Sequence, residues 1–201
     1  MNRTMDVNMK PESAQLLLLN RDVVAQLLQP DEVLQAVRDA FVLHSQRAGR
    51  SFAVVREALA TGGIFGIKSG DVAAQLLLGF KAAGFWPANR ALGGEPHQAT
   101  VMLFDPATGR PQCMLDGNAI TTVRTGAAGA LGLQLLARPD SSRLMVFGTG
   151  VQARIQLQFA QQVLPGLRQV RYRSYDGQPC PDFEACAVAG STVELAADAN
   201  A

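Results

Sequence analysis

The chain has 201 residues, 48% of them hydrophobic, and its 18 Lys and Arg against 17 Asp and Glu leave a formal net charge of +1. This length predicts one or two domains, and the hydrophobic content suffices for a packed core. The near-zero charge, with no basic face, argues against nucleic acid or an anionic membrane as a partner. The longest apolar run near the start, residues 16–19, is too short for a signal core or a membrane span.

Three cysteines, Cys113, Cys180 and Cys186, show no CxxC or Cys/His spacing. Their odd number and irregular spacing argue against a disulfide framework and against zinc, so no metal site is expected. Small buried hydrophobic side chains are the simpler interpretation. The expected compartment is the reducing cytoplasm.

The first part of the chain predicts a mixture of strands and helices. Pro30 and Asp31 open one helix, and the turn from Asp105 to Gly109 joins two short apolar runs as a hairpin. The predicted elements are a strand over 15–20, a helix over 30–46, strands over 51–57, 63–69, 76–82, 100–104 and 111–115, and a helix over 121–136. A polar joint at 138–142 ends this first α/β domain, which we assign to residues 1–138.

A buried strand over 144–147 then runs into Gly148-x-Gly150-x-x-Ala153, and an amphipathic helix follows over 151–163. Strand, glycine turn and helix in this order are typical of a dinucleotide-binding unit. Gly148 permits the tight turn, Gly150 lets the backbone approach a pyrophosphate, and Ala153 lets the helix pack close to the strand. The helix start would hold the phosphates. The alternative is an ordinary strand-to-helix turn that uses glycine only for its geometry.

A strand over 169–174, a short helical piece over 182–189 and a strand over 192–196 complete the pattern. A doubly wound domain of six strands needs about as much chain again. Residues 139–201 therefore predict the first half of a Rossmann-type NAD(P)-binding domain, in an α/β protein. We expect a C-terminally truncated form. We therefore do not expect the 201-residue chain by itself to be a competent enzyme, because a sheet edge and apolar helix faces stay uncovered.

Lys81 lies in an otherwise apolar stretch with Phe80, Phe85 and Trp86. A lysine there is costly to bury unless it meets an anion. The alternative is a side chain that extends to water from a strand edge. Lys68 is a second cation in a segment expected to be ordered.

Arg124 lies within the first turns of the helix predicted over 121–136. Arginine normally favours the other end of a helix, so its place here indicates a bound carboxylate or phosphate. Thr125 beside it offers a hydroxyl group.

Five ordered blocks carry a resemblance to a known family. They are Gly79-Phe-Lys81 with Pro87-x-Asn89, Leu103-Phe-Asp105 with Thr108-Gly-x-Pro111, Thr121-x-x-Arg124-Thr-x-Ala127-Ala, Leu136-Ala-Arg-Pro139, and Gly148-Thr-Gly-Val-Gln-Ala153. With these blocks the chain resembles the ornithine cyclodeaminase and mu-crystallin family over nearly its whole length.

The resemblance implies a homodimer whose first domain binds the substrate and builds the dimer interface, while the second binds NADP(H) or NAD(H). The implied chemistry is hydride transfer at the α-carbon of a small amino or imino acid. Lys81, as the catalytic residue, and Arg124 match residues that hold the substrate carboxylate, and Arg50 is a third such candidate. The positions matched to the cofactor are Thr125, Gly148, Thr149, Gly150, Val151 and Gln152.

The chain also departs from the family. The family's catalytic aspartate falls beyond residue 201. Lys68 stands where some members carry an acidic or apolar residue, and an extra cation there would change which substrate side chain fits. Two reactions remain open: reduction of a cyclic ketimine such as pyrroline- or piperideine-2-carboxylate, and cyclodeamination of ornithine to proline and ammonia. The alternative from another class is a mu-crystallin-like NADP(H)-binding protein or an inactive fragment.

The nicotinamide cofactor is predicted from the end of the second strand of the nucleotide-binding half. An acidic residue about 20 positions past the glycine motif would hydrogen-bond the ribose 2′-hydroxyl of NAD(H). Counting on from the motif reaches Arg173 and Ser174, which suit a 2′-phosphate and favour NADP(H). Asp176 lies close by and would favour NAD(H) instead.

Overall fold

The computed structural model describes residues 15–188 and 190–196. The chain forms two compact units. Unit 1 comprises Met1–Asn20 and Arg50–Leu115, and unit 2 comprises Arg21–Gly49 and Asp116–Ala201. The compact units therefore differ from the ranges 1–138 and 139–201, because three helices from the first range pack in unit 2. As functional domains, those two ranges stay a prediction.

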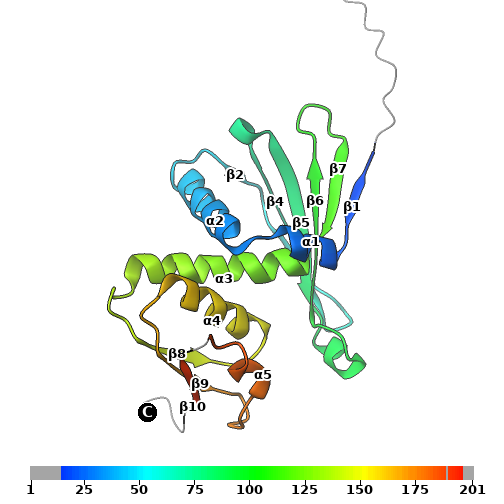
Figure 1. Cartoon of the computed structure of the whole chain (residues 1–201). Helices are drawn as coiled ribbons and strands as arrows, with labels where there is room; N and C mark the ends of the chain where they lie inside the picture. The colour runs from blue at the N-terminus through cyan, green and yellow to red at the C-terminus, as the bar shows by residue number, and fades with distance from the viewer. Residues whose placement is uncertain (1–14, 189, 197–201) are drawn as a thin grey trace, which may run out of the picture. The chain divides into compact units, whose positions relative to one another are not determined.

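Unit 1 is built on a mixed seven-stranded sheet (Figure 1). Its strands are β1 (Leu17–Leu19), β2 (Arg50–Ser51), β3 (Val55–Ala58), β4 (Ile64–Val72), β5 (Leu77–Phe85), β6 (His97–Phe104) and β7 (Pro111–Asp116). They lie in the order β1-β7-β6-β5-β4-β2, with β3 also paired to β4. β1 runs parallel to β7, whereas β4 is antiparallel to β2, β3 and β5.

The predicted hairpin is confirmed as β6 and β7. The Asp105 carboxylate accepts hydrogen bonds from Ala107 N and Thr108 Oγ1, each at 2.8 Å. These bonds lower the pKa of Asp105. Gly109 takes a φ of +69°, a conformation that suits glycine. The turn therefore closes with the residues that the sequence analysis singled out.

Unit 2 holds a three-stranded parallel sheet and its helices (Figure 1). The elements are α1 (Arg21–Leu27), α2 (Pro30–Ser45), α3 (Gly117–Leu136), β8 (Arg143–Phe147), α4 (Val151–Val163), β9 (Gln169–Arg173), α5 (Pro181–Glu184) and β10 (Thr192–Leu195). The strand order β10-β9-β8 is that of the first half of a doubly wound nucleotide-binding sheet, as predicted.

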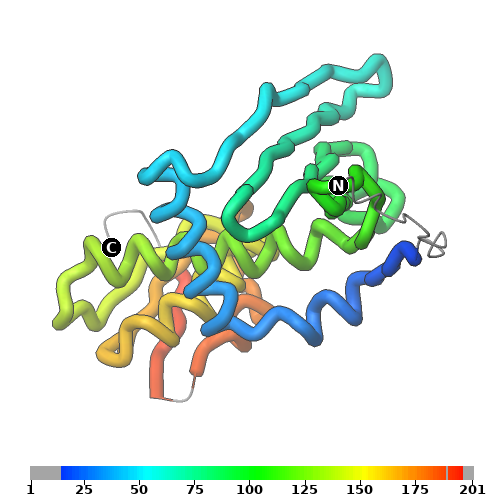
Figure 2. Tube along the Cα trace, turned by 90° about the horizontal axis from the view of Figure 1, so that it is seen from above, coloured from blue at the N-terminus to red at the C-terminus, as the bar shows by residue number. Residues whose placement is uncertain are grey.

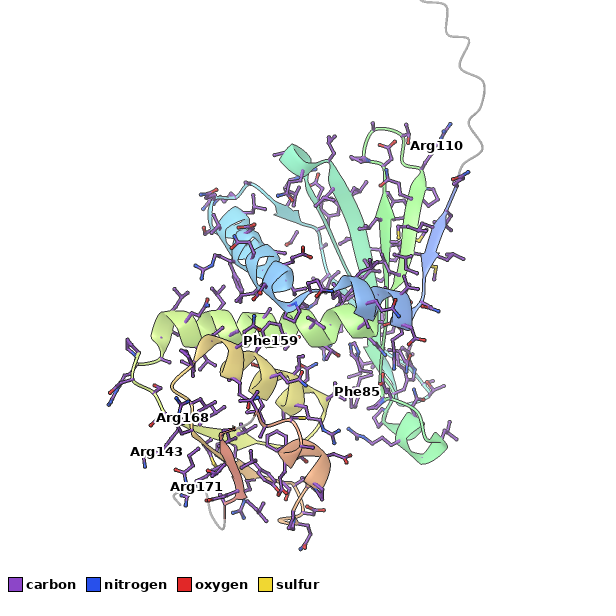
Figure 3. The ribbon with its side chains drawn as sticks, viewed as in Figure 1. Phe85, Arg110, Arg143, Phe159, Arg168 and Arg171 are labelled. Carbon is purple, nitrogen blue, oxygen red and sulfur yellow. The ribbon has the colours of Figure 1, made fainter. Side chains whose placement is uncertain are left out.

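A core of buried side chains joins α4 to this sheet. Leu157 of α4, Val170 and Tyr172 of β9, and Phe183 of α5 are fully buried. On the other side of α4, Phe159 packs with Ala127 and Ala130 of α3 (Figure 3). Helix α3 also contacts α2, which crosses it in the view of Figure 2. Burial of this apolar surface is the main stabilising term for such a core.

Two helix predictions are wrong in part, and one helix was missed. Helix α3 begins at Gly117, four residues before the predicted start, because the Asp116 carboxylate caps it by accepting from Ala119 N at 2.8 Å. Arg124 is thus the eighth residue of α3, in about its third turn, and the dipole argument for an anion beside it fails. Helix α1 was not predicted, and α5 ends at Glu184 rather than near 189, which lies outside the described residues.

Glycine allows α3 and α4 to approach closely. A Cβ on Gly126 would lie 2.6 Å from Phe159 Cδ2, and one on Gly129 would lie 1.9 Å from Gln156 Oε1. Gln156 Nε2 donates to the Thr125 carbonyl at 2.9 Å. A side chain at Gly126 would therefore overlap Phe159, and one at Gly129 would displace the end of the Gln156 side chain that contacts α3.

We predict opposite effects for two matched substitutions in α3. Gly126→Ala should lower the free energy of unfolding by about 1–3 kcal/mol, because it overpacks the contact with Phe159. Gly132→Ala should raise it by about 0.5–1 kcal/mol, because no atom lies within 4 Å of the added Cβ and alanine favours the helix. Urea denaturation measures both. Equal effects of the two substitutions would contradict the close packing of α3 on α4.

Candidate functional site

The backbone of the turn between β8 and α4 lies beside space that no described protein atom fills. Gly148 takes a φ of +91°, and its N–H donates to Arg173 O at 2.8 Å, which ties the turn to the end of β9. Gly150 is the N-cap residue of α4. A Cβ on either glycine would meet nothing within 4 Å. The space beside both residues is therefore not filled by the described protein atoms.

The start of α4 suits an anion. No side chain caps the start of α4 at Gly150, and the first turn of this helix contains no acidic residue. Arg154 places its guanidinium group beside this turn, where Nε donates to Thr149 O at 3.1 Å. Unpaired N–H groups at a helix start and the positive end of its dipole attract phosphate. Arg154 was not predicted as a site residue. Its only signal in the sequence is that a cation follows soon after the motif glycines.

The carboxyl ends of the parallel strands carry the residues predicted to select the cofactor. Arg173 is exposed at the end of β9. Ser174 is buried, and its hydroxyl donates to Gln178 O at 2.6 Å, so its hydrogen is already used within the turn. The hydrogen bond from Gln178 N lowers the pKa of Asp176, which is therefore a carboxylate at neutral pH.

On α3, Arg124 is exposed and Thr125 is half-buried. The Thr125 hydroxyl donates to Thr121 O at 2.5 Å, within the helix. On α4, Val151 and Gln152 lie exposed in the first turn. The contact between Gln156 and Thr125 O holds this part of α3 to α4, so unit 2 brings Thr125 and the glycine turn into one packed body.

In unit 1, Lys68 of β4 and Lys81 of β5 are directly opposite each other. Directly opposite residues of an antiparallel pair share one face of the sheet, with Cβ atoms about 4.5–5.5 Å apart. Lys68 is exposed and Lys81 is half-buried. The register thus brings these two predicted site residues together, which the sequence spacing could not show.

Arg50 of β2 forms an ion pair with its opposite residue, Asp71 of β4. Arg50 Nε lies 2.8 Å from Asp71 Oδ1, and Nη2 also contacts Oδ2. This hydrogen bonding raises the pKa of Arg50 and lowers that of Asp71. Because side chains alternate along β4, the pair lies on the face opposite Lys68. Asp71, which lies 21 residues from Arg50 in the sequence, was not predicted as its partner.

Three further observations bear on the predicted class of site. Cys113 is buried, and Cys180 and Cys186 pack against the core of unit 2; all three are free thiols. The part of the chain that the structure describes contains no cluster of three or more His, Cys, Asp or Glu side chains able to hold a metal ion. No helix within residues 15–188 and 190–196 is long and apolar enough to cross a membrane.

Three known proteins of similar sequence or fold are, by their names, enzymes that act on imino or amino acids. The chain is 36% identical over 149 residues to the iminosuccinate reductase of Paracoccus denitrificans, a match that covers 74% of this chain and 47% of that protein. A solved structure of the Thermococcus litoralis Δ1-pyrroline-2-carboxylate reductase, in complex with NADH and L-proline, matches with a TM-score of 0.82 and 26% identity over 91% of this chain and 57% of that one. An archaeal alanine dehydrogenase dimer with bound NAD gives a TM-score of 0.83 at 26% identity, over 90% of this chain and 56% of that one.

The chain spans about half the length of these relatives. The family model that matches covers residues 14–200 and describes the ornithine cyclodeaminase/mu-crystallin family. That match includes the residues of the glycine turn and both sheets described above. The chain belongs to the ornithine cyclodeaminase/mu-crystallin family.

Proposed function

We propose that the protein transfers hydride between NAD(P)(H) and the α-carbon of a small amino or imino acid. The observation that carries this proposal is the family match across residues 14–200, with the open glycine turn and Lys81 both retained. The relatives named above reduce iminosuccinate or Δ1-pyrroline-2-carboxylate or dehydrogenate alanine, as their names say. Each of those reactions changes the hydrogen count at an α-carbon.

The cofactor phosphates are proposed to bind at Gly148, Thr149 and Gly150, with Val151, Gln152 and Thr125 beside them. The open backbone and the uncapped start of α4 fit a pyrophosphate. The bound nicotinamide ring would supply or accept the hydride. Residues 139–201 would thus serve as the cofactor-binding domain and 1–138 as the substrate-binding and dimerisation domain.

NADP(H) is proposed over NAD(H), because Arg173 is exposed at the end of β9, where a 2′-phosphate is recognised in this fold. Ser174 contributes less to 2′-phosphate binding than the sequence suggested, since its hydroxyl donates to Gln178 O. The charged Asp176 would select NAD(H) instead. Dissociation constants for NADPH and NADH distinguish the two.

Lys81 and Arg124 are proposed to bind the substrate carboxylate, as the family resemblance implies. Holding that carboxylate would fix the α-carbon for hydride transfer, and positioning of this sort lowers barriers by several kcal/mol. Arg50 is a weaker candidate, because its guanidinium group is already paired with Asp71 and lies on the face opposite Lys81. Lys68 is proposed as a further substrate contact, because it lies directly opposite Lys81.

Reduction of an imine is favoured over cyclodeamination of ornithine, since the relatives named above include two reductases. Loss of NAD(P)H absorbance with an imine identifies a reductase. Ammonia release from ornithine without net cofactor change identifies a cyclodeaminase. Tight NADPH binding without either turnover would support the mu-crystallin-like binding protein. A homodimer in the cytoplasm is the proposed state, and one solved relative is a dimer.

Gly150→Val should weaken NAD(P)H binding at least about tenfold, because a side chain would fill the space proposed for the pyrophosphate. The free energy of unfolding should change by less than about 1 kcal/mol, because a Cβ there meets no protein atom within 4 Å. Fluorescence titration with NADPH and NADH measures the affinity, and urea denaturation measures the stability. Unchanged affinity for both cofactors would contradict the proposed cofactor site.

Lys81→Met in the full-length protein should lower kcat/KM for the imine at least about a hundredfold, the size expected for losing a charge-assisted contact in an active site. NAD(P)H affinity should change little. Arg110→Met is the matched control, because Arg110 is exposed at the tip of the β6–β7 hairpin (Figure 3). Near-normal kcat/KM in the Lys81 variant would show that this lysine only extends to water from its strand.

A further inference from the structure

The hydroxyl group of Tyr172 closes the loop that joins β9 to α5, residues 174–180, which we call the β9–α5 loop (Figure 1). Tyr172 lies in β9, and its side chain is fully buried. The hydroxyl accepts a hydrogen bond from Cys180 N at 2.8 Å and donates one to the Glu184 carboxylate. Because Cys180 directly precedes α5, this single buried oxygen fixes where the loop ends relative to the strand from which it starts.

Packing alone does not require this hydroxyl group. The rings of Tyr172 and Phe183 have centroids 4.9 Å apart, and a phenylalanine ring would fill the same space in the core. Burial and the hydrogen bond to the Glu184 carboxylate raise the pKa of Tyr172, so the hydroxyl keeps its proton at neutral pH. A buried hydroxyl group is unfavourable unless it is hydrogen-bonded. What the hydroxyl adds is therefore its two hydrogen bonds, one to the end of the loop and one to α5.

The β9–α5 loop is also held by bonds within itself. The Ser174 hydroxyl donates to Gln178 O at 2.6 Å, and Gln178 N donates to Asp176 Oδ1 at 3.0 Å. Gly177, between these residues, takes a φ of +71°, a conformation that suits glycine. The Asp176 carboxylate thus accepts a hydrogen bond inside the turn that the loop forms.

The start of the loop is tied to the turn that is proposed to hold the cofactor phosphates. Arg173 separates Tyr172 from the loop, and its carbonyl accepts a hydrogen bond from Gly148 N at 2.8 Å. Arg173 and Asp176 are the two residues whose charges favour opposite cofactors, one on either side of Ser174 and Tyr175. The bonds of Tyr172 and Gly148 together therefore fix the segment that carries both charges.

We propose that Tyr172 is a positioning residue that holds the β9–α5 loop in the arrangement that selects between NADP(H) and NAD(H). This inference rests on the proposed function. Tyr172 is buried and acts through Arg173 and Asp176, which flank the position proposed for the 2′ group of the cofactor. A segment that is fixed before binding loses less conformational entropy when it binds. Without the hydroxyl the loop gains other arrangements, so discrimination between a 2′-phosphate and a 2′-hydroxyl should fall.

The test measures dissociation constants of the full-length protein for NADPH and NADH by fluorescence titration. Tyr172→Phe should shift the ratio of the two constants at least about fivefold toward equality, because both hydrogen bonds of the hydroxyl are lost. Glu184→Ala, a second variant of the same network, should shift the ratio in the same direction. Glu184→Gln should retain most of the preference, because it keeps an oxygen that can accept from Tyr172.

Val170→Ala is the matched control. Val170 is fully buried in the same strand and core, and none of the hydrogen bonds of the loop involves its side chain. Its substitution should lower the free energy of unfolding by leaving a cavity, yet keep the ratio of the dissociation constants within about twofold. The control separates the positioning of the loop from a general loss of stability.

Hydrogen exchange followed by mass spectrometry supplies a readout that needs no cofactor. Exchange over residues 174–180 should become at least about tenfold faster in Tyr172→Phe and change less than about threefold in Val170→Ala. Unchanged exchange, an unchanged ratio in Tyr172→Phe, or equal shifts in Val170→Ala would overturn this inference and leave the proposed function standing. Equal affinity of the unsubstituted protein for NADPH and NADH would do the same. Binding of neither cofactor by the unsubstituted protein would overturn the proposed function together with this inference.

Discussion

The close approach of α3 to α4 is the constraint on which the candidate cofactor site depends. Gly126 and Gly129 bring no side chain from α3 into the contact, where Phe159 and Gln156 of α4 lie against them, and Gln156 donates to the Thr125 carbonyl. Two sequence blocks that the chain separates by more than twenty residues, around Thr125 and Gly148, are therefore held in one compact unit. Widening this contact would move Thr125 relative to the turn that is proposed to hold phosphate.

In unit 1 the corresponding constraint is the register of β4 against β5. It places Lys68 opposite Lys81 and leaves glycine or alanine at the adjoining positions. The same register puts Asp71 on the other face, where it pairs with Arg50. A slip of a single residue would exchange these faces and put the Asp71 carboxylate on the face of Lys81. Which charged side chains share a face with Lys81 thus follows from strand pairing as much as from residue type.

Sequence patterns predicted the elements that depend on local signals. The strand, glycine turn and helix around Gly148 were confirmed, as was the hairpin closed by Asp105. The start of α3 was wrong, since Gly117 and Asn118 are poor helix formers and the Asp116 cap was overlooked. Strand register decides that Arg50 pairs with Asp71 and that Lys68 lies opposite Lys81. Single-sequence patterns do not specify this register.

Hydride transfer to an α-carbon is the central step of the proposed function, and isotope transfer tests that step most directly. The full-length protein would be incubated with an imine, ammonia and NAD(P)H that carries deuterium at C4 of the nicotinamide, in separate 4R and 4S forms. If the protein transfers hydride, one form and not the other will deliver deuterium to the α-carbon of the amino acid, as measured by mass spectrometry and proton NMR. An amino acid product without deuterium from either form, or no amino acid product at all, would contradict it.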